Sequence, residues 1–202
     1  MKLLKEQFYD ILRLLINQIG IAIFSFLLYS AVSMISEDSK DLRVQINLYV
    51  SIFATLFLFV LLYTVTWEYG AKDRIRVDGG RLQYDRLKGF KMAGFAYSPI
   101  VFLVALALIF GILFIGTDVN GFGTAQTVLA LIAAFFVFPY TGIVAFILSS
   151  FEITGAYYSL VQEALYLVLI LLSIGVIQFA YTMGYKEKKL FSSSAGNKTK
   201  KQ

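Results

Sequence analysis

The chain has 202 residues, of which 58% are hydrophobic and 15% charged, and its formal net charge is +5. It contains no cysteine and no histidine, which excludes disulfides, thiolate nucleophiles and zinc sites built from these two ligands. Long apolar segments with short connections use nearly all of its length, so no soluble domain of ordinary size fits beside them. The composition predicts an all-α membrane protein, and we expect no cofactor.

Residues 1–13 precede the first apolar segment and combine apolar with charged side chains. Leu4, Phe8, Ile11 and Leu15 recur at helical spacing, while charged residues occupy the rest of the helical wheel. We expect an interfacial helix over 1–13 that leads into the first span. A plain polar extension of that span is the alternative.

Uncharged apolar runs of span length follow one another along the rest of the chain. A membrane span needs ~20 mainly apolar residues to cross a hydrocarbon core of ~30 Å. The runs predict a polytopic helix bundle, a single transmembrane domain over residues 1–190, with a disordered tail over 191–202. They are Leu14–Ile35, Leu48–Trp67, Met92–Gly116, Val119–Phe151 and Ala164–Tyr185.

A basic segment, residues 68–92, separates the second run from the third. A short loop with more basic than acidic residues belongs in the cytoplasm by the positive-inside rule. Its side chains could bind anionic lipid headgroups at ~1 kcal/mol each, dock a protein partner, or serve as the topological signal alone. Gly79-Gly80 predicts either a β-hairpin or, as we favour, a turn followed by a helix from about Leu82. The candidates for lipid or partner binding are Lys72, Arg74, Arg76, Arg81, Arg86, Lys88 and Lys91.

The fourth run is compatible with two topologies, because Pro139 removes a backbone donor near its middle. A re-entrant hairpin broken at Pro139 leaves sixteen of the eighteen basic residues inside and two outside. One kinked span leaves ten inside and eight outside. The charge bias therefore favours four full spans plus a re-entrant segment, with both termini cytoplasmic, and five spans are the alternative.

Non-helical backbone at membrane depth is tolerated where it is buried in protein or lines water. The residues at the predicted break are therefore candidates for lining a transport pathway: Pro139, Tyr140, Thr141 and Gly142. Inside the uncharged runs, Asn17, Gln18, Gln126 and Gln178 are expected to hydrogen-bond between helices. Without an ionisable residue at a central position, the runs argue against a proton pump.

Two helix ends share a short motif. Trp67-Glu-Tyr-Gly-Ala-Lys-Asp-Arg74 and Tyr181-Thr-Met-Gly-Tyr-Lys-Glu-Lys188 both contain Gly-x-Lys-acid-base in the same register. The motif indicates either two helix exits with a glycine cap or, as in transporters built from repeats, a duplicated half.

The first of these motifs, Gly94 and Pro99 in the next run, and the closing Met183-Gly-Tyr-Lys186 resemble uncharacterised small multi-pass membrane proteins of Firmicutes. The resemblance covers short patches. It implies a bacterial plasma membrane and no known activity.

For catalysis the sequence offers no nucleophile with a base partner, and it contains no nucleic-acid-binding module. We therefore predict a non-enzymatic accessory or assembly subunit of a membrane complex, in contact with lipid and with a membrane-protein partner or a second copy of itself. A transporter or channel subunit with its pathway near Pro139 to Gly142 is the alternative.

Overall fold

The computed structural model describes residues 2–35, 40–117 and 119–187, so the predicted tail over 191–202 lies outside the described residues. Within the described ranges the chain is helical, with short turns and connections between the helices. The elements are α1 (Lys2–Ile35), α2 (Lys40–Asp78), α3 (Lys88–Thr117), α4 (Asn120–Val137), the 3-10 helix η1 (Phe138–Tyr140), α5 (Thr141–Ser150) and α6 (Ala156–Tyr185).

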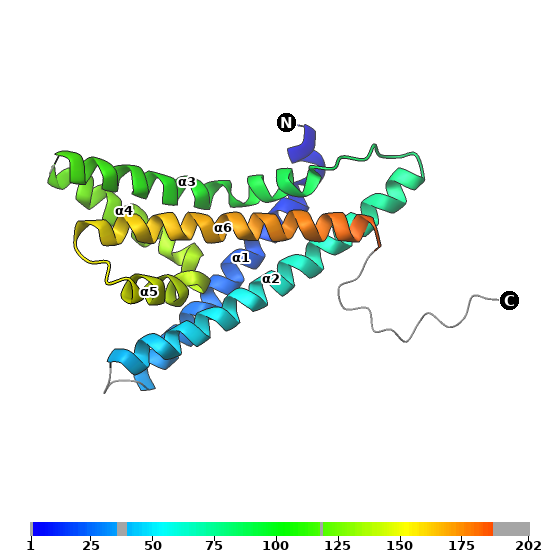
Figure 1. Ribbon diagram of the computed structural model, residues 1–202. Helices are drawn as coiled ribbons and strands as arrows, with labels where there is room; N and C mark the ends of the chain where they lie inside the picture. The colour runs from blue at the N-terminus through cyan, green and yellow to red at the C-terminus, as the bar shows by residue number, and fades with distance from the viewer. Residues whose placement is uncertain (1, 36–39, 118, 188–202) are drawn as a thin grey trace.

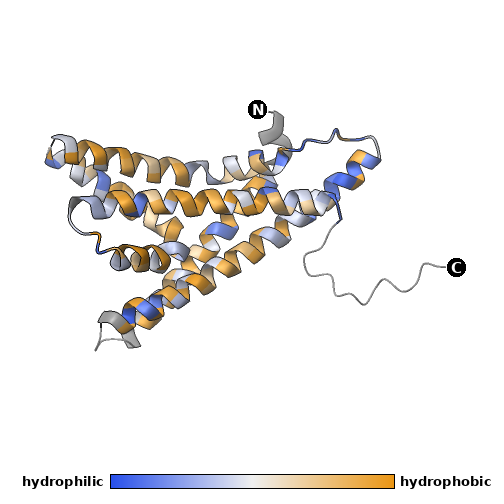
Figure 2. Ribbon diagram, viewed as in Figure 1, coloured by the Kyte–Doolittle hydropathy of each residue, from blue (hydrophilic) through white to orange (hydrophobic). Residues whose placement is uncertain are grey.

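Five helical segments are long and apolar enough to cross a membrane, which confirms an all-α, multi-pass membrane protein. Because helices satisfy their own backbone hydrogen bonds, such sequences can place apolar side chains on every face. Figure 2 shows hydrophobic residues along the length of the helices, with hydrophilic ones gathered towards helix ends. The segments are Phe8–Val32, Leu42–Asp78, Lys88–Thr117, Asn120–Ser150 and Tyr157–Tyr185.

Four long helices, α1, α2, α3 and α6, run between two ends of the molecule (Figure 1). We call the end where α2 and α6 finish and α3 begins the basic end, and the other the opposite end. α1 also begins at the basic end, since Asp10 lies within electrostatic range of Asp73 and Lys88. α1 and α3 therefore run away from the basic end, whereas α2 and α6 run towards it.

The segment between α3 and α6 enters the bundle only part of the way. Gln126 in α4 and Leu160 in α6 both lie against Gly111 of α3, near the opposite end. After the helix break, the hydroxyl of Tyr140 lies 2.7 Å from that of Ser173. Ser173 is 13 residues beyond Leu160 on α6, or ~20 Å along the helix axis. From Gln126 to Tyr140 the chain thus moves into the interior.

α5 then brings the chain back towards the opposite end. Leu148 and Ser149 line one surface pocket with Val44, near the start of α2, and Tyr158, near the start of α6. Figure 1 shows α5 between α2 and α6, joined to the start of α6 by a short connection. The structure therefore has the predicted four full spans and a re-entrant hairpin. One kinked span would have placed the starts of α4 and α6 at different ends.

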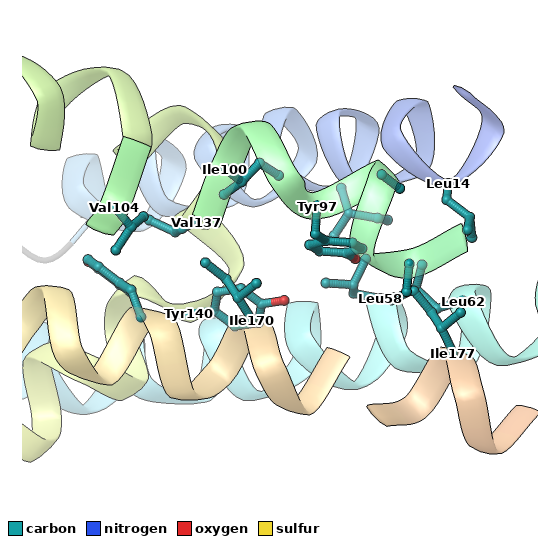
Figure 3. Packing of buried hydrophobic residues seen from close by; sticks show 14 of the residues in the cluster. Leu14, Leu58, Leu62, Tyr97, Ile100, Val104, Val137, Tyr140, Ile170 and Ile177 are labelled. Atoms are coloured by element: carbon teal, nitrogen blue, oxygen red, sulfur yellow. The ribbon is translucent and has the colours of Figure 1, made fainter. Parts of the chain in front are cut away.

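The core lies where the hairpin tip meets the four long helices. Figure 3 shows apolar side chains from these elements converging around Tyr97 and Tyr140. Both tyrosines are at most 1% exposed. Burying aromatic side chains of this size gives the tip a large contact area, which fixes its depth in the bundle.

The predicted interfacial helix is part of α1, because α1 continues without a break from Lys2 to Ile35. The basic segment is also more helical than expected. α2 extends to Asp78, and its 39 residues reach ~58 Å, well beyond a hydrocarbon core. Neither the hairpin nor the helix from Leu82 is present: α3 begins at Lys88, where the Asp85 carboxylate accepts the backbone N–H of Leu87.

The shared motif lies at the closest approach of α2 and α6. A Cβ on Gly70 would collide with the backbone of α6 at Tyr181 and Tyr185, and one on Gly184 would collide with the Trp67 carbonyl. α2 continues for eight residues after Gly70, so this glycine does not cap the helix as the motif suggested. The two glycines instead allow α2 and α6 to cross in backbone contact.

Candidate functional site

The helix break at η1 is held by side chains from α1 and α2. Pro139 cannot donate a backbone hydrogen bond, and its ring disfavours a continuous helix, so the carbonyls and N–H groups around it need other partners. Gln18 Nε2 donates to the carbonyl of Phe136 at 2.7 Å. Thr55 Oγ1 donates to the carbonyl of Pro139 at 2.9 Å. Partners at these two carbonyls stabilise the break inside the bundle.

The first turn of α5 is fixed in the same way. The N–H of Gly142 donates to Ser51 Oγ at 2.7 Å. A Cβ on Gly142 would collide with the Asn47 carbonyl and with Ser51, so glycine lets α5 start directly against α2. Both α2 residues are buried, and the hydrogen bond is therefore removed from water.

Two tyrosines extend this polar network across the bundle. Tyr97 of α3 donates to Gln18 Oε1 at 2.9 Å, so the Gln18 amide joins α1, α3 and α4. Tyr140 and Ser173 share a hydrogen bond between η1 and α6. The expectation that Gln18 bonds between helices is therefore confirmed.

The four pathway candidates lie together at the tip of the hairpin. Pro139, Tyr140 and Gly142 are buried, and Thr141 is half-buried. In this conformation the tip packs against protein. The backbone groups that the helix break leaves without helical partners bond to Gln18, Ser51 and Thr55. Such a site can hold the hairpin at a defined depth.

Of the seven basic candidates, Lys88 differs most from the prediction. Its ammonium group forms an ion pair with Asp73, and the two side chains are 9% and 4% exposed. Tyr181 of α6 donates to the same carboxylate at 2.9 Å. A lysine paired in this way is not placed to meet lipid headgroups, and Asp73, which the sequence indicated as a loop residue, belongs to this buried cluster.

Arg74 and Lys91 bond to exposed acids. Arg74 lies 3.0 Å from Glu187, beyond the end of α6, and 3.5 Å from Asp78. Lys91 donates to Asp85, and this hydrogen bond lowers the pKa of the Asp85 carboxyl below its usual value of 3.8. These pairs tie α2 to the residues after α6 and the start of α3 to the preceding turn.

The remaining four basic candidates are the most open. Lys72 and Arg76 are more than half exposed and form long pairs, at 3.9 Å to Glu68 and 3.8 Å to Asp73. Arg81 and Arg86 are exposed, and within the described ranges neither guanidinium group has an ion pair. These four side chains remain candidates for headgroup binding.

Gln178 attaches the start of α3 to α6. Its Nε2 donates to the Arg86 carbonyl and its Oε1 accepts the N–H of Phe90, both at 2.8 Å. Phe90 lies in the first turn of α3, where backbone N–H groups lack partners within the helix. The predicted helix-to-helix role of Gln178 is confirmed.

Glu163 directly precedes the predicted run Ala164–Tyr185, so the sequence alone puts this ionisable residue at the edge of a span. The structure puts it two turns inside α6, 2% exposed, with Oε2 lacking a hydrogen-bond partner in the part of the chain that the structure describes. An uncharged run ends by definition at the first charged residue, so such runs cannot reveal that the helix continues past Glu163. A helical-wheel analysis that included Glu163 with Tyr166 and Ile170 would have placed it on the buried face.

Comparisons with protein-family models, curated proteins and solved structures find no match to this chain.

Proposed function

We propose that this chain is a non-enzymatic accessory or assembly subunit of a membrane complex in a bacterial plasma membrane. The observation that carries the proposal is the hairpin break, whose backbone groups bond to Gln18, Thr55 and Ser51. A hairpin fixed at several points gives the subunit a rigid shape, which suits a scaffold for other membrane helices. The outer faces of the helices carry large apolar side chains, for contact with lipid and with a membrane-protein partner or a second copy.

We further propose that both termini are cytoplasmic. The basic segment lies at the end of the bundle where α1 begins and α6 finishes. The positive-inside rule therefore supports a cytoplasmic position for the basic segment and for both termini. At that surface Lys72, Arg76, Arg81 and Arg86 would contact anionic headgroups.

The subunit role is tested by extracting the tagged chain from its native membrane into lipid nanodiscs without detergent. We expect particles that contain the 22.7 kDa chain with a partner membrane protein, or with further copies, in a fixed ratio. Particles with one copy and no partner at a fixed ratio would contradict the proposal. A matched chain in which Arg81 and Arg86 are both replaced by Gln tests whether these guanidinium groups contribute to assembly or to the associated anionic lipid.

A transporter or channel subunit is the second candidate, and two features favour it. Half-helices that meet inside a bundle form the binding sites of many transporters, and an ionisable residue within a span is a default marker of function. Here α4 and α5 meet at Tyr140, and Glu163 is buried in α6. The discriminating measurement is labelling of a Thr141→Cys variant by a small water-soluble thiol reagent. Labelling during turnover favours transport, and protection under all conditions favours the scaffold.

A further inference from the structure

Two acidic residues are buried within the described ranges, Asp73 and Glu163, and they differ in whether their carboxyl oxygens have partners. Asp73, at the basic end, has a lysine and a tyrosine on its carboxylate. Glu163 is equally buried, yet its Oε2 has no hydrogen-bond partner among the described residues. A charged carboxylate in apolar surroundings is strongly disfavoured unless it is paired, so the group in this packed state is expected to carry a proton.

The helices around Glu163 provide no positive charge at its depth. Charged residues are absent from α4, from α5, from residues 92–117 of α3 and from residues 44–67 of α2, and Glu163 is the one charged residue of α6. Tyr166, one turn further along α6, is within electrostatic range of Glu163, and its hydroxyl already bonds to Gln162 at 3.2 Å and to Thr141. Tyr158 lies on the same helix. The other packed elements contribute Tyr97 of α3, Tyr140 of η1, and Tyr49, Tyr63 and Tyr69 of α2.

A pocket at the opposite end is lined as far as Gln126, whose neighbour Leu160 is one turn before Glu163 on α6. A pocket between α3 and α4 is open at that end, and its wall includes Asn120, Thr124 and Gln126. Gln126 and Leu160 meet at Gly111, where a side chain larger than hydrogen would collide with both. Glu163 follows Leu160 by three residues on α6, or ~4.5 Å along its axis. Gln126 Nε2 also has no hydrogen-bond partner in the described ranges.

We propose that Glu163 is a proton-binding site that exchanges with water at the opposite end through the pocket beside Gln126. Uptake forms one O–H bond at a carboxylate oxygen with a proton from water, and release returns that proton to water. Asn120, Thr124 and Gln126 supply polar groups on the side of the pocket, and Gly111 lets Gln126 and Leu160 approach closely where α3, α4 and α6 meet. The proposal goes beyond the subunit role and holds whether or not the chain also transports a solute.

The test uses the full chain in lipid nanodiscs and an apolar carbodiimide, which adds to a protonated carboxyl in an apolar site to give a stable N-acylurea. Peptide mass mapping should find the adduct on Glu163, and its yield should fall roughly tenfold per pH unit above the midpoint of the titration. A water-soluble carbodiimide should modify the exposed Glu152 and spare Glu163. No adduct on Glu163 with the apolar reagent, or a yield independent of pH, would overturn the proposal.

Three further measurements distinguish proton binding from the binding of another cation and from a purely structural role of Glu163, and test the contribution of Gly111. Protection of Glu163 from the carbodiimide by sodium or potassium at constant pH would show a cation site and overturn the proton site.

In thermal unfolding, the wild type should lose stability relative to Glu163→Gln as pH rises, because the amide mimics the protonated acid and has no proton to lose. An unchanged difference between the two from acid to alkaline pH would contradict the proposal. Gly111→Leu, which places a larger side chain against Gln126 and Leu160, should slow modification of Glu163 while the modification of Glu152 stays the same.

Discussion

The two ends of the bundle bury a carboxyl group in different ways. At the basic end, α2 and α6 touch at Gly70 and Gly184, and the buried Asp73 has both a lysine and a tyrosine partner. Towards the opposite end the same helices separate, α5 lies between them, and the buried Glu163 has an unpartnered oxygen. A buried carboxylate without a partner is costly to the fold, so Glu163 marks the half of the molecule where function is to be sought.

Breaking the buried ion pair should have the largest effect on stability. Lys88→Met leaves the Asp73 carboxylate buried without its main partner, at an expected cost of about 3–5 kcal/mol in the free energy of unfolding. The measurement is reversible unfolding in mixed micelles. Lys91→Met is the matched control, since its ion pair with Asp85 is exposed and should contribute less than about 1 kcal/mol. Equal losses in the two variants would contradict the distinction between buried and exposed pairs.

The helix crossing at the basic end should be the next most sensitive point. Gly184→Ala places a Cβ against the Trp67 carbonyl, and overpacking of this kind costs about 1–3 kcal/mol. Gly175→Ala on the same helix has nothing within 4 Å and should be neutral or slightly stabilising. Thermal unfolding of both variants in detergent checks this, and a Gly175→Ala variant as unstable as Gly184→Ala would argue against a specific crossing.

At the hairpin tip, single hydrogen bonds should have a smaller effect. Thr55→Val removes the donor to the buried Pro139 carbonyl and should cost about 1–2 kcal/mol. Thr64→Val, on the same helix, removes a hydroxyl that bonds locally to the Val60 carbonyl at an exposed position. That control should change the free energy of unfolding by less than about 0.5 kcal/mol. If Thr55→Val is equally silent, its hydroxyl does not hold the break.

The smallest effect is expected at Asp85, and it depends on pH. The Lys91 hydrogen bond lowers the pKa of Asp85, so the pair stabilises the folded state above the usual value of 3.8. This stability is lost as pH falls through the lower pKa of the folded state. Asp85→Asn should therefore cost less than about 1 kcal/mol at neutral pH and nothing at strongly acidic pH. Unfolding free energies measured against pH for both chains check the sign, and a difference that grows in acid would contradict it.

The sequence predicts the re-entrant hairpin but not the side chains that bond to its break. The re-entrant hairpin follows from local chemistry and charge: Pro139 within a long run, and a basic tail that only a returning chain keeps with the other basic residues. The partners that close the break, such as Gln18 and Thr55, lie more than 80 residues away, and no spacing rule connects them. The apolar pattern places the end of a helix too early where charged residues continue the helix beyond the membrane, as α2 does as far as Asp78.

The surroundings of Asp73 and Glu163 could not be predicted from the sequence either. Asp73 and Glu163 are both acidic residues, and an acidic residue in the sequence alone suggests a loop or the edge of a span. Only the packing of α2, α3 and α6 buries both and gives Asp73 a partner. Sequence pattern locates apolar faces, whereas the partner of a buried charge is a property of the tertiary contacts.

Because α4 and α5 turn back inside the bundle, Asn120 and Thr154 are expected on the same side of the membrane. The chain has no cysteine, so single-cysteine variants Asn120→Cys, Thr154→Cys and Gln83→Cys report without background, and all three positions are exposed. A membrane-impermeant thiol reagent on intact cells should label Asn120→Cys and Thr154→Cys and spare Gln83→Cys. All three should react once the membrane is permeabilised. Labelling of Asn120→Cys with protection of Thr154→Cys in intact cells would mean that the segment crosses the membrane, and would contradict the re-entrant hairpin.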